Sequence, residues 1–219
     1  MFVGHYGVSF AAKKFEPGIS LWLLFVAVQW LDVVWAPLVL LGIERVRIVP
    51  GITASNPLDL YYMPYTHSLV AAVLWSAAAF LVYRIIARRS TTAAALVVAG
   101  AVFSHWVLDF VVHRPDLPLY DNAAKVGLGL WNFAVLAFVI ETALFFGGMY
   151  LYLRTEARRR PAIVAFGVFM LAVHAFTFFG APPSSDRAAA IAALSAYTVF
   201  ALVIRFLEPA TQHATAPQP

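Results

Sequence analysis

The chain has 219 residues, of which 62% are apolar and 12% are charged, and its mean hydropathy is +0.80. Water-soluble domains contain about 45–50% apolar and about 25% charged residues. This composition therefore excludes a water-soluble domain and indicates a polytopic membrane protein. The formal net charge of +4 does not indicate a nucleic-acid partner, because the basic residues gather at the ends of apolar segments. The chain has no cysteine, which excludes disulfides and thiolate metal ligands.

Residues 1–12 are apolar but too few to span a bilayer, and Lys13 and Lys14 follow them. A signal peptide carries its positive charges before its apolar run, so this segment is not one. We expect an interfacial helix or a short re-entrant helix. A re-entrant helix that folds back into the bilayer from Lys13 would lift His5 by roughly 12 Å, near the level of Asp32, whereas a helix on the surface would keep His5 out of reach.

Six further segments are apolar and long enough to cross a bilayer, which takes about 20 residues. They are residues 19–41, 65–86, 92–112, 130–153, 161–180 and 187–207. The expected fold is therefore all-α, a polytopic membrane bundle that forms one domain over residues 1–208. The hydrophilic residues 209–219 are expected to form a disordered tail.

Lysine and arginine are divided unequally between the two sides of this expected bundle. One side holds ten, Lys13 and Lys14 among them, and the other side holds five, namely Arg45, Arg47, Arg114, Lys125 and Arg187. Cytoplasmic loops are enriched in Lys and Arg. We therefore expect both termini in the cytoplasm and the protein in the inner (cytoplasmic) membrane.

The third apolar segment ends in a polar stretch, where His105, Asp109 and His113 recur every four residues. Each step climbs about 6 Å along a helix, so His105 and Asp109 can share an ion, whereas His113 lies about 12 Å from His105 and is expected at the rim. By the expected topology, ionisable groups of other segments reach the same outer half or its loops: Asp32, His67, Glu141 and Asp59. Ionisable groups inside a membrane are costly and mark functional sites, so this convergence indicates a polar cavity.

Three interpretations compete for this cavity. Imidazole and carboxylate groups suit a zinc site, in which a metal-bound water of lowered pKa is the nucleophile and Asp59 or Glu141 orients or deprotonates it. The same groups also suit a proton or ion pathway. The third interpretation is structural, because buried polar residues also hold helices together. That one is favoured for the lone His174, while a site is favoured where several ligand types share one depth.

Three short motifs resemble those of the YdjM-like membrane-bound metal-dependent hydrolases. They are Gly4-His5, Thr66-His67-Ser68 and Ser104-His105 with Asp109 four residues after the histidine. The resemblance covers roughly residues 4–132 and leaves the last two spans unmatched. It implies a metal site made of His5, Asp32, His67, His105 and Asp109. The chain departs from the family in lacking a second acidic residue beside Asp32 and in having His113.

Together, the residues and the resemblance predict a membrane-embedded hydrolase that acts on an ester or phosphoester of a lipid or another amphiphilic molecule. Its cofactor is expected to be a divalent metal ion, zinc by ligand type, and membrane lipids are the expected partners. The catalytic candidates are Asp59, Glu141 and His113, the last at the mouth of the cavity. The alternative is a small proton- or ion-coupled transporter that uses the same cavity. The sequence does not define the oligomeric state.

Overall fold

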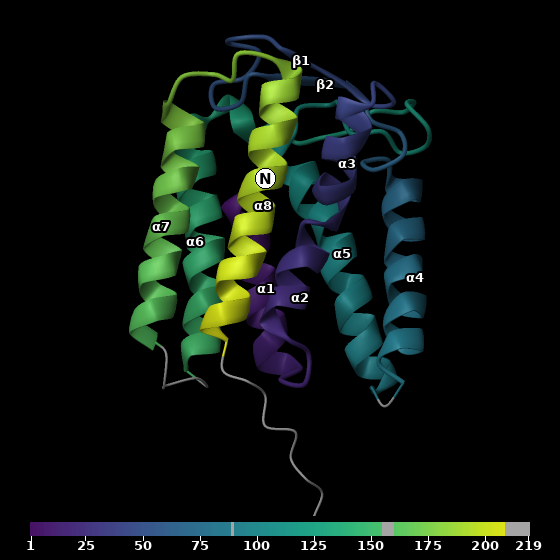
Figure 1. Ribbon diagram of the computed structural model, residues 1–219. Helices are drawn as coiled ribbons and strands as arrows, with labels where there is room; N and C mark the ends of the chain where they lie inside the picture. Colours follow the sequence, from purple (N-terminus) through teal and green to yellow (C-terminus); the bar gives the residue numbers. More distant parts are fainter. Residues whose placement is uncertain (89, 155–159, 209–219) are drawn as a thin grey trace, which may run out of the picture.

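A computed structural model describes residues 1–88, 90–154 and 160–208, and within them the chain forms eight α-helices, a 3-10 helix and two short strands (Figure 1). Five helices are long and apolar enough to cross a membrane, and a bent pair would make a sixth span. They are α4 (Leu69–Ile86), α5 (Thr92–Val112), α6 (Ala134–Leu153), α7 (Arg160–Phe179), α8 (Asp186–Leu207) and the pair α2 (Leu21–Val28) with α3 (Trp30–Leu40). The expected all-α membrane bundle is confirmed. The expected tail, residues 209–219, lies outside the described residues.

The first expected span is not one straight helix. It breaks at Gln29, where α2 and α3 meet at 53°. Two other spans begin later than expected, because residues 65–68 precede α4 and a 3-10 helix, η1 (Leu130–Asn132), precedes α6. The Ser68 hydroxyl accepts a hydrogen bond from the amide of Ala71, at 3.1 Å, and so caps α4. His67 therefore lies on a turn just before its span rather than in the span's first turn.

The first helix, α1 (Val3–Phe15), folds back into the bundle as the re-entrant alternative proposed. It starts halfway along the bundle, at the point marked N, and runs to the end opposite the strands (Figure 1). It packs against α2, α5, α6 and α7, and the side chains of Val3, Tyr6 and Phe10 are fully buried. His5 is consequently at the centre of the molecule.

Two glycines allow α1 to lie against α6. A Cβ added to Gly7 would overlap the backbone carbonyl of Leu144, and a Cβ added to Gly148 would overlap that of Gly7. In membrane bundles, association depends on close backbone packing, which small residues permit. The position of α1, and with it that of His5, therefore depends on these two residues.

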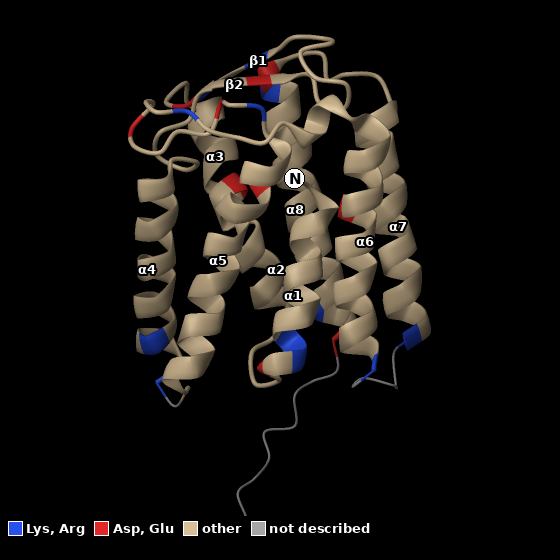
Figure 2. Cartoon of the chain, turned by 180° about the vertical axis from the view of Figure 1, so that it is seen from behind, with Lys and Arg blue, Asp and Glu red and all other residues tan. Residues whose placement is uncertain are grey.

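One end of the bundle, here called the hairpin end, carries the irregular structure. An antiparallel pair, β1 (Arg45–Ile48) and β2 (Leu58–Tyr62), joins α3 to α4, and residues 113–133 join α5 to α6 beside it (Figure 1). Basic residues lie at both ends, whereas the acidic positions inside the bundle lie in its hairpin half (Figure 2). The hairpin, which pairs Arg47 with Asp59, is structure that the expected loop did not include.

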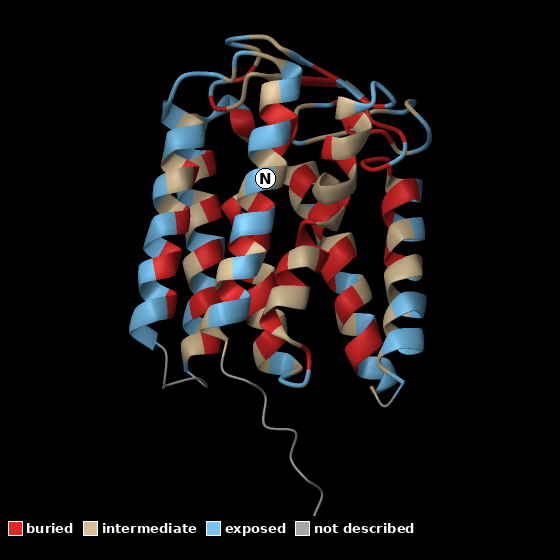
Figure 3. Ribbon diagram, viewed as in Figure 1, coloured by how far each residue is buried: buried red, intermediate tan, exposed pale blue. Residues whose placement is uncertain are grey.

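The apolar core has two parts with the polar residues between them. Leu31 and Trp106 belong to the cluster in the half away from the hairpin, and Trp35 and Val112 belong to the cluster beneath it. Asp32 and Asp109 follow Leu31 and Trp106 along their helices, so they lie where the two clusters meet. On the outer helices α4, α7 and α8, buried positions face inward and exposed ones face outward (Figure 3). The fold thus places a polar layer inside an apolar bundle.

Candidate metal centre

Asp109 of α5 is the hub of this polar layer, and its two carboxylate oxygens face different partners. Oδ1 lies 3.2 Å from Nε2 of His5 and contacts the amino group of Met1. Oδ2 lies 3.2 Å from Nε2 of His105, 3.5 Å from Nε2 of His113 and 3.7 Å from Nε2 of His67. Four imidazoles thus converge on one carboxylate.

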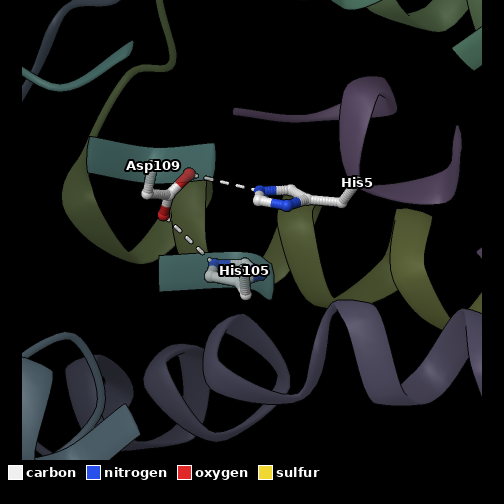
Figure 4. Close-up of side chains that lie close together, drawn as sticks. All are labelled: His5, His105 and Asp109. Carbon is white, nitrogen blue, oxygen red and sulfur yellow. Dashed lines mark hydrogen bonds and ion pairs between the residues drawn. The ribbon is translucent and has the colours of Figure 1, made fainter. Parts of the chain in front are cut away.

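His5, His105 and Asp109 form a buried group that can hold a metal ion (Figure 4). The imidazole rings of His5 and His105 are stacked, with centroids 4.0 Å apart and planes 3° apart. The two rings come from different helices, and both side chains are fully buried. One ligand atom from each residue lies within 4.8 Å of the others, so all three can reach one ion.

Asp32, His67 and His105 form a second such group, which overlaps the first at His105. Oδ1 of Asp32 lies 3.2 Å from Nε2 of His67 and 3.7 Å from Nε2 of His105. Asp32 lies in the first turn of α3, directly after the break at Gln29. The two groups contain all five residues for which the resemblance implies a metal role.

His105 is oriented by the same helix break. Its Nδ1 lies 2.7 Å from the carbonyl oxygen of Val28, the last residue of α2. A carbonyl only accepts, so Nδ1 carries the proton and donates it. Nε2, which is buried and has no hydrogen-bond partner, then faces the two carboxylates. Histidines that bind metals are typically fixed in this way through their other ring nitrogen.

His67 is held by a relay to Glu44. The Thr66 hydroxyl donates to Oε2 of Glu44 at 2.7 Å, so its oxygen accepts from Nδ1 of His67, also at 2.7 Å. Oε1 of Glu44 accepts the amides of Tyr65 and Thr66, at 2.8 and 3.0 Å. Burial raises the pKa of Glu44, an effect that nearby His67 and these hydrogen bonds oppose. The relay presents Nε2 of His67 to Asp32.

His113, just beyond the end of α5, is held by the hairpin end. Its Nδ1 lies 2.8 Å from Oδ1 of Asp116, whose Oδ2 accepts from Nε of Arg114 at 3.1 Å. Burial by itself would lower the pKa of His113, but the charges of Asp109 and Asp116 outweigh it and raise that pKa to about 9. His113 thus lies beside the two metal-binding groups without belonging to either.

The donor atoms of this cluster fit a divalent cation. With Nδ1 protonated on His67 and His105, each Nε2 presents a lone pair towards carboxylate oxygens. Two acceptors that face each other in a buried site need a cation between them, a proton or a metal ion. Imidazole and carboxylate are ligands that suit zinc. The buried group can therefore hold a metal ion.

The remaining catalytic candidates, Asp59 and Glu141, belong to neither metal-binding group. Asp59, in β2, pairs with Arg47 and Arg114 and is connected to the cluster through Arg114, Asp116 and His113. Glu141, in α6, accepts the amide of Phe2 at 2.7 Å and so caps the start of α1. Nε2 of the buried His174 lies 3.9 Å from Oε2 of Glu141, among phenylalanine rings.

A cavity of about 580 Å³ opens onto the cluster. Asp32, His67, Asp109 and His113 line one part of it, and the rest is formed mainly by α7, α8 and residues 55–58. Small-molecule sites typically have volumes of about 300–1,000 Å³ and mostly apolar walls. The cluster is thus accessible to a ligand of moderate size.

Two supporting residues were not among the sequence candidates. Tyr197 of α8 donates to Oδ2 of Asp32 at 2.6 Å, although it reads as an ordinary aromatic residue of an apolar span. Glu44 reads as an isolated acid at a span end. A third supporting residue, Thr66, could be predicted, because it precedes the candidate His67 in the Thr-His-Ser motif.

Comparison of the chain with protein-family models, with curated proteins and with solved structures gives no match in any of the three. The resemblance to the YdjM-like hydrolases therefore stays a prediction made from short motifs, and the function must be argued from the cluster itself.

Proposed function

We propose that this protein is a membrane-embedded, metal-dependent hydrolase that acts on an ester or phosphoester of an amphiphilic molecule. The observation that carries the proposal is the convergence of four imidazoles on Asp109, with Asp32 beside them, at the inner end of a cavity. Within the cluster, Nε2 of His105 faces the carboxylates of Asp32 and Asp109 without a hydrogen-bond partner, and a buried polar atom of that kind is a candidate for binding an ion.

In this proposal His5, His67, His105, Asp32 and Asp109 hold the ion, which is zinc by ligand type. When bound, a zinc ion lowers the pKa of water towards neutrality and polarises an ester or phosphoryl oxygen. The chain's own residues fix the geometry: the Val28 carbonyl and the Thr66–Glu44 pair orient His105 and His67. Hydrolysis adds water across the scissile bond, which yields an alcohol and an acid.

His113 is the candidate for moving the proton. Its Nε2 faces Asp109 inside the cavity, while Asp116 holds its Nδ1. An imidazole in this position can donate a proton to the leaving alcohol. In this proposal Asp59 holds Arg114, which in turn pairs with Asp116 beside His113. Glu141 accepts the Phe2 amide and so fixes the start of α1.

The orientation expected from the Lys and Arg bias would place the cluster in the outer half of the inner membrane, with both termini in the cytoplasm. The transporter alternative lacks a comparable observation. The cavity lies in the hairpin half, and the buried cluster with Phe25, Phe145 and Phe166 fills the other half.

The test is hydrolysis by purified protein in lipid nanodiscs, with 4-nitrophenyl esters and bis(4-nitrophenyl) phosphate as probes. We expect turnover that a chelator abolishes and zinc restores, and that His105→Ala lowers by at least about 100-fold. His213→Ala, which changes a histidine far along the sequence, is the control. Zinc-loaded wild type with no turnover on either probe class, but with pH-gradient-driven flux in liposomes, would favour the transporter.

A further inference from the structure

The cavity beside the cluster has two unlike parts. One part carries the ionisable residues Asp32, His67, Asp109 and His113. The other is lined by small or apolar residues of α7 and α8, which are Val173, Phe176, Phe178, Ala188, Ala192 and Ala196. A cavity with one charged part and one apolar part complements an amphiphilic molecule.

The alanines of α8 that line the cavity share one face of the helix. Ala188, Ala192 and Ala196 follow one another at intervals of four residues, and Ala189 and Ala193 lie beside them. Residues four apart lie above one another on a helix. Their methyl groups leave space that larger side chains would fill, and α7 and α8 accordingly touch each other only sparsely.

The cavity opens sideways between these two helices. Phe176 lines it and is 70% exposed, and Thr177 and Ala192 both line it and are exposed. Below the hairpin the cavity is closed, because Ser55 and Trp131 are buried and the Ser55 hydroxyl donates to the Trp131 carbonyl at 2.9 Å. The opening extends along α7 and α8 to the loop that joins them, where Ala181 and Ser184 line the cavity and are exposed. Since α7 and α8 are both candidate membrane spans, the sideways opening faces the hydrocarbon of the membrane.

The carboxyl group of Glu141, which lines the cavity, has an oxygen without a hydrogen-bond partner. Glu141 lines the cavity and is fully buried, and its Oε1 has no hydrogen-bond partner, although Oε2 accepts the Phe2 amide. An unpaired carboxyl oxygen at such a position costs free energy unless a ligand donates to it. A substrate hydroxyl that reaches Glu141 would supply the missing donor.

We propose that an amphiphile with a long apolar tail, an acyl or prenyl chain, reaches the cluster sideways between α7 and α8. Its tail lies along the alanine face of α8 and against Phe176, and its polar end lies at the cluster, within reach of Glu141. The chemistry at that polar end rests on the proposed hydrolytic function, whereas the tail site rests on the cavity.

The binding test uses palmitic acid that carries a diazirine near the end of its chain, cross-linked to purified wild type in detergent and mapped by mass spectrometry. We expect labelled peptides from α7 and α8 that excess palmitate suppresses. Ala192→Trp should lower this labelling at least fivefold. Ile191→Trp is the matched control, because its side chain is 53% exposed and does not line the cavity. Equal labelling in the two variants would overturn the proposal.

The activity test compares 4-nitrophenyl palmitate with 4-nitrophenyl acetate. Ala192→Trp should lower the ratio of kcat/KM for the long ester over the short ester at least tenfold, and Ile191→Trp should not change it. Ala192→Leu serves if the tryptophan variant does not fold. Hydrolysis without any dependence on tail length would overturn the tail site alone, and displaceable labelling without hydrolysis by zinc-loaded wild type would overturn the hydrolytic function alone.

Discussion

The two ends of α1 both carry buried charged groups, but they differ in what those groups leave unsatisfied. Near its last turn, Nζ of Lys13 donates to the carbonyls of Pro17 and Ile19, at 2.9 and 2.7 Å, and pairs with Glu208 at 2.7 Å. An ammonium group has three donors, so Lys13 is saturated. Near the first turn, His5 joins a cluster in which Nδ1 of His5 and Nε2 of His105 have no hydrogen-bond partner.

This contrast separates a structural ion pair from a ligand site. Glu208 also accepts the amide of Leu21, at 2.8 Å, and so fixes the turn between α1 and α2. Lys13 therefore has no proton left for a further partner. The His/Asp cluster, by comparison, brings the ligand atoms of five residues together and opens onto a cavity. Burial and charge are common to both regions, so the features that mark the site are the convergence of several ligand atoms and the cavity beside them.

The largest effect should come from Gly148→Leu, because it prevents α1 from packing against α6 and so removes both regions at once. We expect a loss of folding stability of more than about 4 kcal/mol and no metal binding, measured by thermal unfolding in detergent and by zinc titration. Gly147→Leu is the control, since a Cβ at Gly147 meets nothing within 4 Å. Similar behaviour of the two variants would show that α1 does not depend on this contact.

Lys13→Met should break the saturated pair and leave the site intact. The variant leaves the Glu208 carboxylate buried without its cation, which costs about 3–5 kcal/mol of stability. Zinc affinity at the cluster should stay within about twofold of wild type, because Lys13 contacts none of the ligand residues. Lys14→Met, at the next and less buried position, should change stability by about 0.5 kcal/mol or less. A loss of zinc affinity in Lys13→Met would mean that the two ends of α1 are not independent.

Thr66→Val should have the smallest effect. It should lower the zinc affinity of the cluster and leave the Lys13–Glu208 pair unchanged. It removes the hydroxyl that connects His67 to Glu44, so His67 is no longer oriented towards Asp32. Removing such a support typically weakens metal binding by about 10–100-fold. Thr198→Val, whose hydroxyl on α8 donates to the Leu194 carbonyl, is the control for losing a threonine hydroxyl. Unchanged zinc affinity in Thr66→Val would exclude the relay as a support.

Much of the fold could be predicted from hydrophobic segment length, since α5, α7 and α8 lie within a residue or so of their expected bounds. The break at Gln29 could not, because residues 19–41 are apolar apart from Ser20, Gln29 and Asp32 and contain no glycine and no proline before Pro37. The β hairpin was missed because its two strands are only four and five residues long.

The candidate residues were found because histidine and aspartate are rare inside spans and recurred at one depth. His113 was expected at the rim from helical rise alone, and it does lie beyond the end of α5, yet its side chain reaches back to Asp109. The supports of the cluster were harder to predict. The Val28 carbonyl is exposed by a helix break, and Glu44 approaches through the hairpin, so both depend on tertiary structure.

The most direct test of the metal centre is the zinc content of purified protein, measured by inductively coupled plasma mass spectrometry after zinc loading and removal of free metal. We predict at least one zinc ion per wild-type chain and per Lys13→Met chain. Asp109→Asn keeps the shape of the side chain but removes the charge on which the four imidazoles converge, and it should retain less than a tenth of the zinc. Wild type without zinc, or Asp109→Asn with as much zinc as wild type, would contradict the metal centre.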